Sequence, residues 1–207
     1  MSFRSRTIVF LAAVMLVAGV AEARGKKPVT EPGKYKEWGN DIDEMEILKP
    51  FHLSDYTTVA VVNFDTSTVA LPDQNDKAYP SIKTVLNGYT ETLVAGMKKE
   101  MHGGPSIEQA STTPKAAKTL ILRGTVDNIS PGSRTKRYLA GYGAGAAGNK
   151  IHGELVDAKS GQVLARFSQQ RRSGGTFKFG GGSDIEVMQD SIHAIGEDLV
   201  HIITAFQ

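Results

Sequence analysis

The stretch KIHGELVDAKSGQVLARFSQQRR, residues 150–172, determines the predicted fold. Residues 150–157 alternate polar and apolar side chains, which is the pattern of a half-buried strand. Residues 157–161 have the composition of a tight turn, and residues 162–172 then return antiparallel. The sequence therefore predicts a β-hairpin, around which the other elements are arranged.

Two further strands and a helix precede this hairpin. Residues 57–65 and 119–129 are short β-branched apolar runs, typical of buried strands. Between them, residues 81–101 carry apolar side chains at helical spacing, after Pro80 and before a glycine pair. A strand, a helix and a second strand in this order favour a right-handed parallel unit.

The last element is the clearest helix of the sequence. Ser183 and Glu186 have the spacing of a capping box. One apolar stripe follows, made of Ile185, Met188, Ile192, Ile195, Leu199, Ile202 and Phe206. The predicted fold is α/β, in the two-layer α+β arrangement β-α-β-β-β-α. It has a mixed four-stranded sheet with two helices on one face.

The amino terminus has the features of an export signal. Arg4 and Arg6 precede the apolar run 7–21, and Ala21-Glu22-Ala23 offers small residues for cleavage before Arg24. The run is shorter than the roughly 20 residues that cross a bilayer, so we expect no transmembrane segment in the mature chain. The predicted organisation is a signal peptide at 1–23, an extended arm at 24–56 and one domain at 57–207. We expect Trp38 to attach the arm to the domain.

The composition excludes several classes of site. The 207 residues include 24 basic and 22 acidic side chains, a balance that gives no reason to expect nucleic-acid binding. The chain has no cysteine, which excludes disulfides, thiolate metal sites and a lipid-modified cysteine.

The glycine run GYGAGAAG, residues 141–148, contains the G-x-G-x-x-G spacing of dinucleotide-binding loops. In such loops a helix opens from the last glycine and supplies free amides to the phosphates. Here a predicted strand follows instead, so we expect no nucleotide cofactor. The glycines are better explained by sharp bending or close approach of the backbone.

The residues around this run are the candidate site. A basic segment precedes the glycines, Arg171 and Arg172 end the hairpin, and a second glycine-rich stretch with two phenylalanines follows at 174–182. This composition favours protein recognition or pairing with anionic groups. The candidate contact face comprises Arg134, Lys136, Arg137, Tyr138, Tyr142, Arg171, Arg172, Phe177 and Phe179.

Residues 131–167 resemble a bacterial family of exported proteins, the domain of unknown function numbered forty-four ten. The shared pattern is P-G-S, an arginine, a glycine-alanine run, a strand ending in aspartate, an S-G turn and a second strand. The resemblance implies an envelope location and a non-catalytic accessory role, with no established activity. Many relatives are predicted lipoproteins with a lipobox cysteine, which this chain lacks.

No catalytic or metal constellation emerges from the sequence. His193, Glu197 and His201 recur one helical turn apart. The two histidines are therefore two turns apart, too far for one zinc ion to bind both. We expect them to flank the apolar stripe. We expect turn capping to account for Asp65 and Asp157 at strand ends.

Two hypotheses follow. The first is a non-enzymatic interaction module that is periplasmic, either soluble or peripheral to the outer membrane. It would bind an envelope protein or an anionic envelope component, and a homo-oligomer is one form of it. The second is a protein that binds a small ligand or a polymer, or an enzyme, with a cleft between the two glycine-rich stretches.

Overall fold

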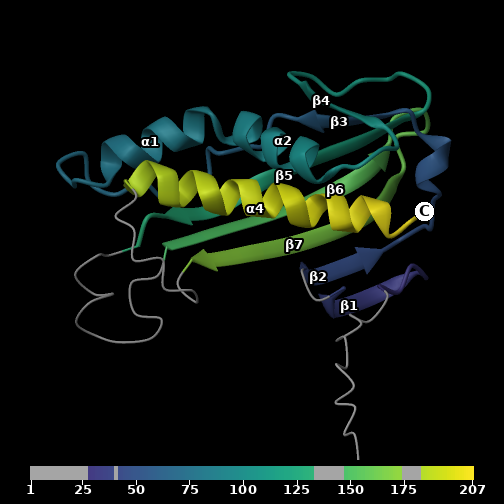
Figure 1. Ribbon diagram of the computed structural model, residues 1–207, viewed down its shortest axis with the longest axis horizontal. Helices are drawn as coiled ribbons and strands as arrows, with labels where there is room; N and C mark the ends of the chain where they lie inside the picture. The colour runs from purple at the N-terminus through teal and green to yellow at the C-terminus, as the bar shows by residue number, and fades with distance from the viewer. Residues whose placement is uncertain (1–27, 40–41, 133–146, 174–182) are drawn as a thin grey trace, which may run out of the picture.

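The predicted hairpin lies at the centre of the sheet. The computed structural model describes residues 28–39, 42–132, 147–173 and 183–207. Strand β6 (Ala147–Asp157) pairs antiparallel with β7 (Val163–Ser173), as the sequence predicts. These two strands belong to a mixed seven-stranded sheet with the order β1-β2-β7-β6-β5-β3-β4 (Figure 1).

The predicted parallel unit is present and has an additional edge strand. β5 (Thr119–Ser130) pairs antiparallel with β6 and parallel with β3 (Thr58–Val62), and β3 also pairs parallel with β4 (Ser106–Ala110). The order of elements predicted from the sequence contains no strand at this position. Its Ile107 is buried, but Ser106, Glu108 and Gln109 are polar, as is common for a short strand at a sheet edge.

The predicted sheet of four strands and the predicted extended arm at 24–56 are both corrected. Within that range, β1 (Gly33–Trp38) pairs with β2 (Ile42–Ile47), and β2 pairs antiparallel with β7. A short 3-10 turn, η1 (Leu53–Asp55), follows. Met45 and Ile47 of β2 are buried, and Glu46 between them points to the other face.

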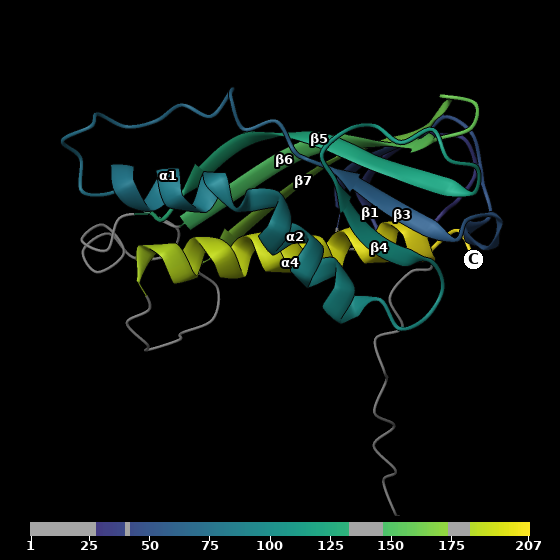
Figure 2. The ribbon, with the colours of Figure 1, turned by 90° about the horizontal axis from the view of Figure 1, so that it is seen from above.

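The helices all cover one face of the sheet (Figures 1 and 2). The predicted helix at 81–101 is instead two helices, α1 (Tyr79–Asn87) and α2 (Tyr89–Glu100). They are separate because Gly88 between them has φ −107° and ψ 15°, outside the helical region. The final helix, α4 (Asp184–Thr204), begins at the predicted capping box, in which Ser183 and Glu186 bond reciprocally. The described residues thus form three helices where two were predicted.

Helices α2 and α4 pack unusually close together (Figure 2). A Cβ atom added at Gly96 would lie 2.2 Å from the carbonyl oxygen of His193, and one at Gly196 would lie 2.4 Å from that of Leu93. Both distances are far below a normal contact, so only glycine permits this approach at either position. The close approach fixes the position of α4 on the sheet.

Aromatic rings close the end of the sheet beside the chain's carboxy terminus. Phe206 stacks on Phe51, with ring centroids 4.3 Å apart, and on Trp38 at 6.3 Å. Tyr56 meets Phe51 edge-on. The indole Nε1 of Trp38 also donates to the carbonyl of Val29 over 2.7 Å. Trp38 therefore joins the amino-terminal strands to the domain, which confirms its predicted role.

Candidate functional site

Both glycine-rich segments of the predicted contact face are flanked by strand ends on one edge of the sheet. Residues 133–146 stand between β5 and β6, and residues 174–182 stand between β7 and α4. In the sheet register Ser130 lies opposite Gly148, and Gly148 lies opposite Arg172. We call the strand ends at Ser130, Gly148 and Arg172 the loop edge; the name refers to the ends of these inner strands and not to an edge strand. It lies at the end of the sheet where α4 begins, opposite the aromatic end (Figure 1).

Most of the predicted contact residues lie outside the described residues. These are Arg134, Lys136, Arg137, Tyr138, Tyr142, Phe177 and Phe179. Arg171 and Arg172 are described, and they are neighbours on β7. Because neighbouring side chains of a strand point to opposite faces, Arg171 turns toward the helices and Arg172 toward the uncovered face.

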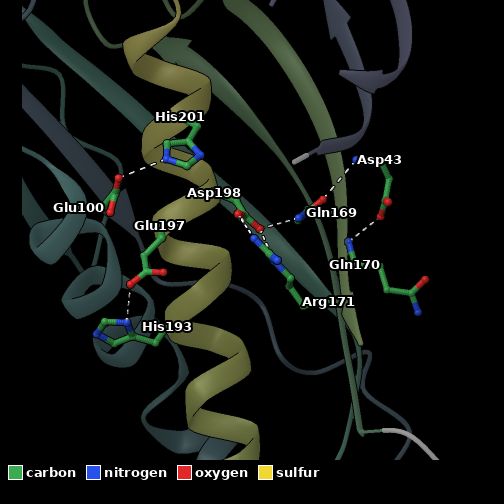
Figure 3. Close-up of polar contacts among 9 residues, drawn as sticks. All are labelled: Asp43, Glu100, Gln169, Gln170, Arg171, His193, Glu197, Asp198 and His201. Carbon is green, nitrogen blue, oxygen red and sulfur yellow. Dashed lines mark hydrogen bonds and ion pairs between the residues drawn. The ribbon is translucent and has the colours of Figure 1, made fainter. Parts of the chain in front are cut away.

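Arg171 is bound to a buried carboxylate of α4 (Figure 3). Its Nε donates to Oδ2 of Asp198 over 2.6 Å, and its Nη2 donates to Oδ1 of the same residue. Only 1% of the Asp198 side chain is exposed, and Nε2 of Gln169 donates to it as well, over 2.6 Å. Arg171 thus has a carboxylate partner within the chain, while 42% of its side chain remains exposed.

Strand β2 joins the same network through its backbone and one aspartate (Figure 3). The backbone N–H of Asp43 donates to Oε1 of Gln169 over 3.2 Å. In return, the carboxylate of Asp43 accepts the backbone N–H of Gln170 over 2.7 Å. These bonds continue the attachment of β2 to β7 beyond the last paired residues of the ladder.

Beside the pair formed by Arg171 and Asp198, a hydrogen bond between two buried side chains joins helix α2 to β6. The hydroxyl of Tyr89 donates to Oδ1 of Asn149 over 2.9 Å, and both side chains are buried. Burial raises the pKa of the Tyr89 phenol well above its ordinary value, so it remains a donor at neutral pH. Asn149 lies directly opposite Arg171 in the ladder, so the two pairs are adjacent.

We call Tyr89, Asn149, Gln169, Arg171 and Asp198 the buried clamp, in which all the side chains except that of Arg171 are buried. It joins α2, β6, β7 and α4 at the loop edge. Within the described residues, the Nδ2 group of Asn149 is the one buried side-chain polar atom without a hydrogen-bond partner. Sequence reasoning missed the clamp, because Asp198 lies beside an apolar stripe and has the pattern of a solvated flank.

Of the two histidines of α4, His193 pairs with a residue of the same helix and His201 with a residue of α2 (Figure 3). Glu197 accepts Nζ of Lys99 over 2.7 Å and lies 3.5 Å from Nδ1 of His193. The bond from Lys99 holds the pKa of Glu197 below its ordinary value, and the His193 charge adds to the effect. His201 lies 3.2 Å from Glu100. These residues flank the apolar stripe, as predicted, and the described part of the chain holds no group of three potential metal ligands.

The two strand-end aspartates cap turns, as predicted. Asp65 accepts the backbone N–H of Ser67 over 2.9 Å, and Asp157 accepts that of Ser160 over 2.7 Å. Bonds from Ser67 and Ser160 lower the pKa of each carboxyl.

A surface groove lies between α2 and α4, on the helix side of the sheet. It measures about 440 Å³ and is lined by Gly88, Glu91, Thr92, Ala95, Gln189, Asp190 and His193. Most of these side chains are exposed, and the groove holds no set of converging buried polar groups. Among the described residues, no helix is long and apolar enough to cross a membrane.

Comparison with known families identifies the chain. The family model described as domain of unknown function DUF4410 matches residues 52–175, and the protein belongs to this family. The resemblance inferred from residues 131–167 is thereby confirmed. No curated protein matches the sequence.

Several solved structures are similar to the chain at low sequence identity. The PelC dodecamer from Paraburkholderia phytofirmans is 14% identical, with a TM-score of 0.46 over 75% of this chain and 95% of that one. Protein XCC0632 from Xanthomonas campestris is 11% identical, with a TM-score of 0.47 over 76% and 91%. Lipoprotein GNA1162 from Neisseria meningitidis is 14% identical, with a TM-score of 0.37 over 69% and 97%.

Proposed function

We propose that this member of the DUF4410 family is a non-catalytic interaction module of the bacterial envelope, and that the loop edge is its contact face. The single observation that carries the proposal is the position of the buried clamp. Three of the six buried polar side chains of the described residues, Asn149, Gln169 and Asp198, belong to this clamp, and Asn149 and Gln169 lie within four residues of the strand ends that flank the candidate segments.

A buried ion pair is weak support for stability, because apolar side chains of similar volume often stabilise a core equally well. Its more specific effect is to fix geometry, since each donor and acceptor has one favourable direction. The clamp ties β6 and β7 to both helices at the edge where the two segments leave the sheet. A rigid base for two recognition segments is what a preformed contact face requires.

The proposed contact groups are those predicted from the sequence, with Arg171 acting through the clamp rather than as a free cation. Arg134, Lys136 and Arg137 would supply the charge, and Tyr138, Tyr142, Phe177 and Phe179 the aromatic contacts. The proposed location is the periplasm, after cleavage before Arg24. Mass spectrometry of the mature protein tests this location directly, because cleavage elsewhere or none gives a different mass.

The contact face is tested by cross-linking in intact cells. Photo-reactive groups replace Tyr138 and Tyr142 in the full chain, which carries a carboxy-terminal tag. We expect a discrete protein adduct that is weakened by Arg134→Ala with Arg137→Ala. The matched control removes the same charge from the helices, through Lys83→Ala with Lys98→Ala, and retains the adduct. An adduct unchanged in the first double variant, or none in the wild type, would contradict the proposal.

A further inference from the structure

The uncovered face of the sheet carries a row of alternating charges across five strands. The row is formed by Lys34 of β1, Glu46 of β2, Arg166 of β7, Glu154 of β6 and Arg123 of β5, which are successive register partners. Lys34 lies 3.2 Å and Arg166 3.4 Å from Glu46. Arg123 donates to Glu154 over 2.8 Å. Every cation of this row therefore has a carboxylate of the chain beside it.

Two residues nearer the loop edge, the pairing continues with a histidine. His152 of β6 lies 2.7 Å from Asp127, which occupies a bulge of β5. The other aspartate of this region, Asp43, is engaged by the backbone of Gln170. Glu44 lies opposite Ser168, four residues from Arg172 along β7, or about 13 Å at the ordinary rise of a strand.

At the loop edge the pairing of basic with acidic side chains ends, and two basic residues are left. Lys150 of β6 and Arg172 of β7 are exposed on the same uncovered face. Arg172 contacts Oε1 of Gln170 at 3.4 Å, and no carboxylate of the described residues pairs with either cation. Gly148 lies opposite Arg172, and a Cβ atom added there would meet no atom of the described residues within 4 Å. Opposite Arg172, where an acidic residue would continue the pairing of opposite charges, the chain has a glycine that no described side chain covers.

We infer that Lys150 and Arg172 form the sheet part of the contact face and bind an acidic, extended segment of a protein partner. This inference rests on the proposed function and specifies the partner's chemistry. Lys150 lies opposite Gln170, two residues from Arg172, so the two cations are diagonal neighbours about 7–8 Å apart. Carboxylates at alternate positions of an extended segment are separated by about 7 Å, which matches that spacing.

A carboxylate ligand fits this surface better than a phosphate. Phosphate sites in proteins generally use converging backbone amides at a helix start or a tight turn. Here the described surface between the two cations consists of paired strands, whose amides are used in the ladder. The helix start nearest the loop edge belongs to α4, which lies on the other face and already carries Asp184 and Glu186 in its first turn.

Substitution at Gly148 tests the inference with little risk to the fold. Gly148→Asp supplies an acid within the chain, opposite Arg172, and completes the alternation. We expect this variant to fold normally and to bind an acidic partner about tenfold more weakly, because its own carboxylate competes for Arg172. Gly148→Thr is the matched control, since it adds a strand-favouring side chain without charge and retains binding.

The probe is a fluorescent peptide with glutamate at alternate positions among serines, titrated against the mature protein. Lys150→Ala with Arg172→Ala is expected to weaken binding about tenfold, and raised salt to weaken wild-type binding as well. Lys83→Ala with Lys98→Ala, which removes the same charge from the helix side, is expected to bind like wild type. Thermal melting of each variant verifies that it is folded.

Two results would overturn the inference. One is unchanged peptide binding by folded Gly148→Asp or by the Lys150 and Arg172 double variant. The other is loss, in these variants, of binding to phosphatidylglycerol vesicles while peptide binding stays the same. If the adduct at Tyr138 and Tyr142 still forms in cells in either case, the proposed function stands and only this inference falls. If wild-type cells give no adduct, the proposed function itself fails.

Discussion

The two ends of the sheet are closed by different chemistry. At the aromatic end, Trp38, Phe51 and Phe206 stack in a core that needs only shape and apolar area. At the loop edge, a carboxylate with 1% exposure is bound by an arginine and a glutamine. Apolar packing would have sufficed at both ends for stability. The difference therefore points to the loop edge as the end where exact geometry matters.

We expect the largest effect on stability from substitutions in the buried clamp. Arg171→Ala removes two hydrogen bonds from the buried carboxylate of Asp198, to which Gln169 still donates, and we expect a loss of about 3–5 kcal/mol in the free energy of unfolding. Chemical denaturation measures it. Arg171→Met combined with Asp198→Leu removes both charges and should return stability to within about 2 kcal/mol of wild type. A double variant as unstable as the single one would show that the ion pair itself stabilises the fold.

The aromatic end is tested by Phe206→Ala, for which we expect a loss of about 3 kcal/mol. The physical reason is the cavity left beside Phe51 and Trp38, which the surrounding structure fills only in part. Unlike the clamp variants, this one should leave cross-linking at the loop edge intact wherever the protein remains folded. An equal loss of the adduct in folded protein would remove the functional contrast between the two ends.

A smaller effect is expected at the start of α4, where the helix joins the loop edge. Ser183→Ala removes the acceptor for the backbone N–H of Glu186 and should cost about 1 kcal/mol. Ser183→Asp keeps an acceptor at the same position and serves as the control, with stability near wild type. Equal melting temperatures for wild type and Ser183→Ala would show that the capping box does not contribute.

The last effect is confined to alkaline pH and concerns the aromatic end. Burial, together with the nearby Asp157, raises the pKa of Tyr56 from 10.0 to about 12. The folded state therefore retains this proton more tightly than the unfolded state, so the associated stability is fully present below pH 10 and is lost as the pH rises toward 12. We expect the melting temperature of wild type to fall more steeply over this interval than that of Tyr56→Phe. Parallel curves for the two proteins would refute the assignment.

The sequence predicted the elements whose pattern is local. The capping box of Ser183, the apolar stripe of α4 and the hairpin of β6 and β7 all follow from spacing within one segment. Strands β1 and β2 were missed because their outward residues, such as Lys34 and Glu46, have the composition of a charged arm. Their pairing depends on partners far along the chain, which no local pattern records.

The candidate site was predictable only in outline. Composition identified a basic edge that includes Arg172, but it could not distinguish Arg172 from Arg171. Strand alternation turns these neighbours to opposite faces, and the buried Asp198 then determines which of them is bound internally. The open position at Gly148 also needed the register, because its meaning comes from Arg172 across the ladder.

The attachment of β2 to β7 sets an order on the folding of a newly made chain. Ile47 pairs with Ala165, so the amino-terminal strands leave the ribosome long before the strand that receives them. During that interval they have only each other, and an isolated two-stranded hairpin is marginally stable in water. Their alternating lysines and glutamates keep the waiting segment hydrated and oppose pairing with other chains. The contacts between β2 and β7 also join residues far apart in the sequence, and contacts of this kind slow folding.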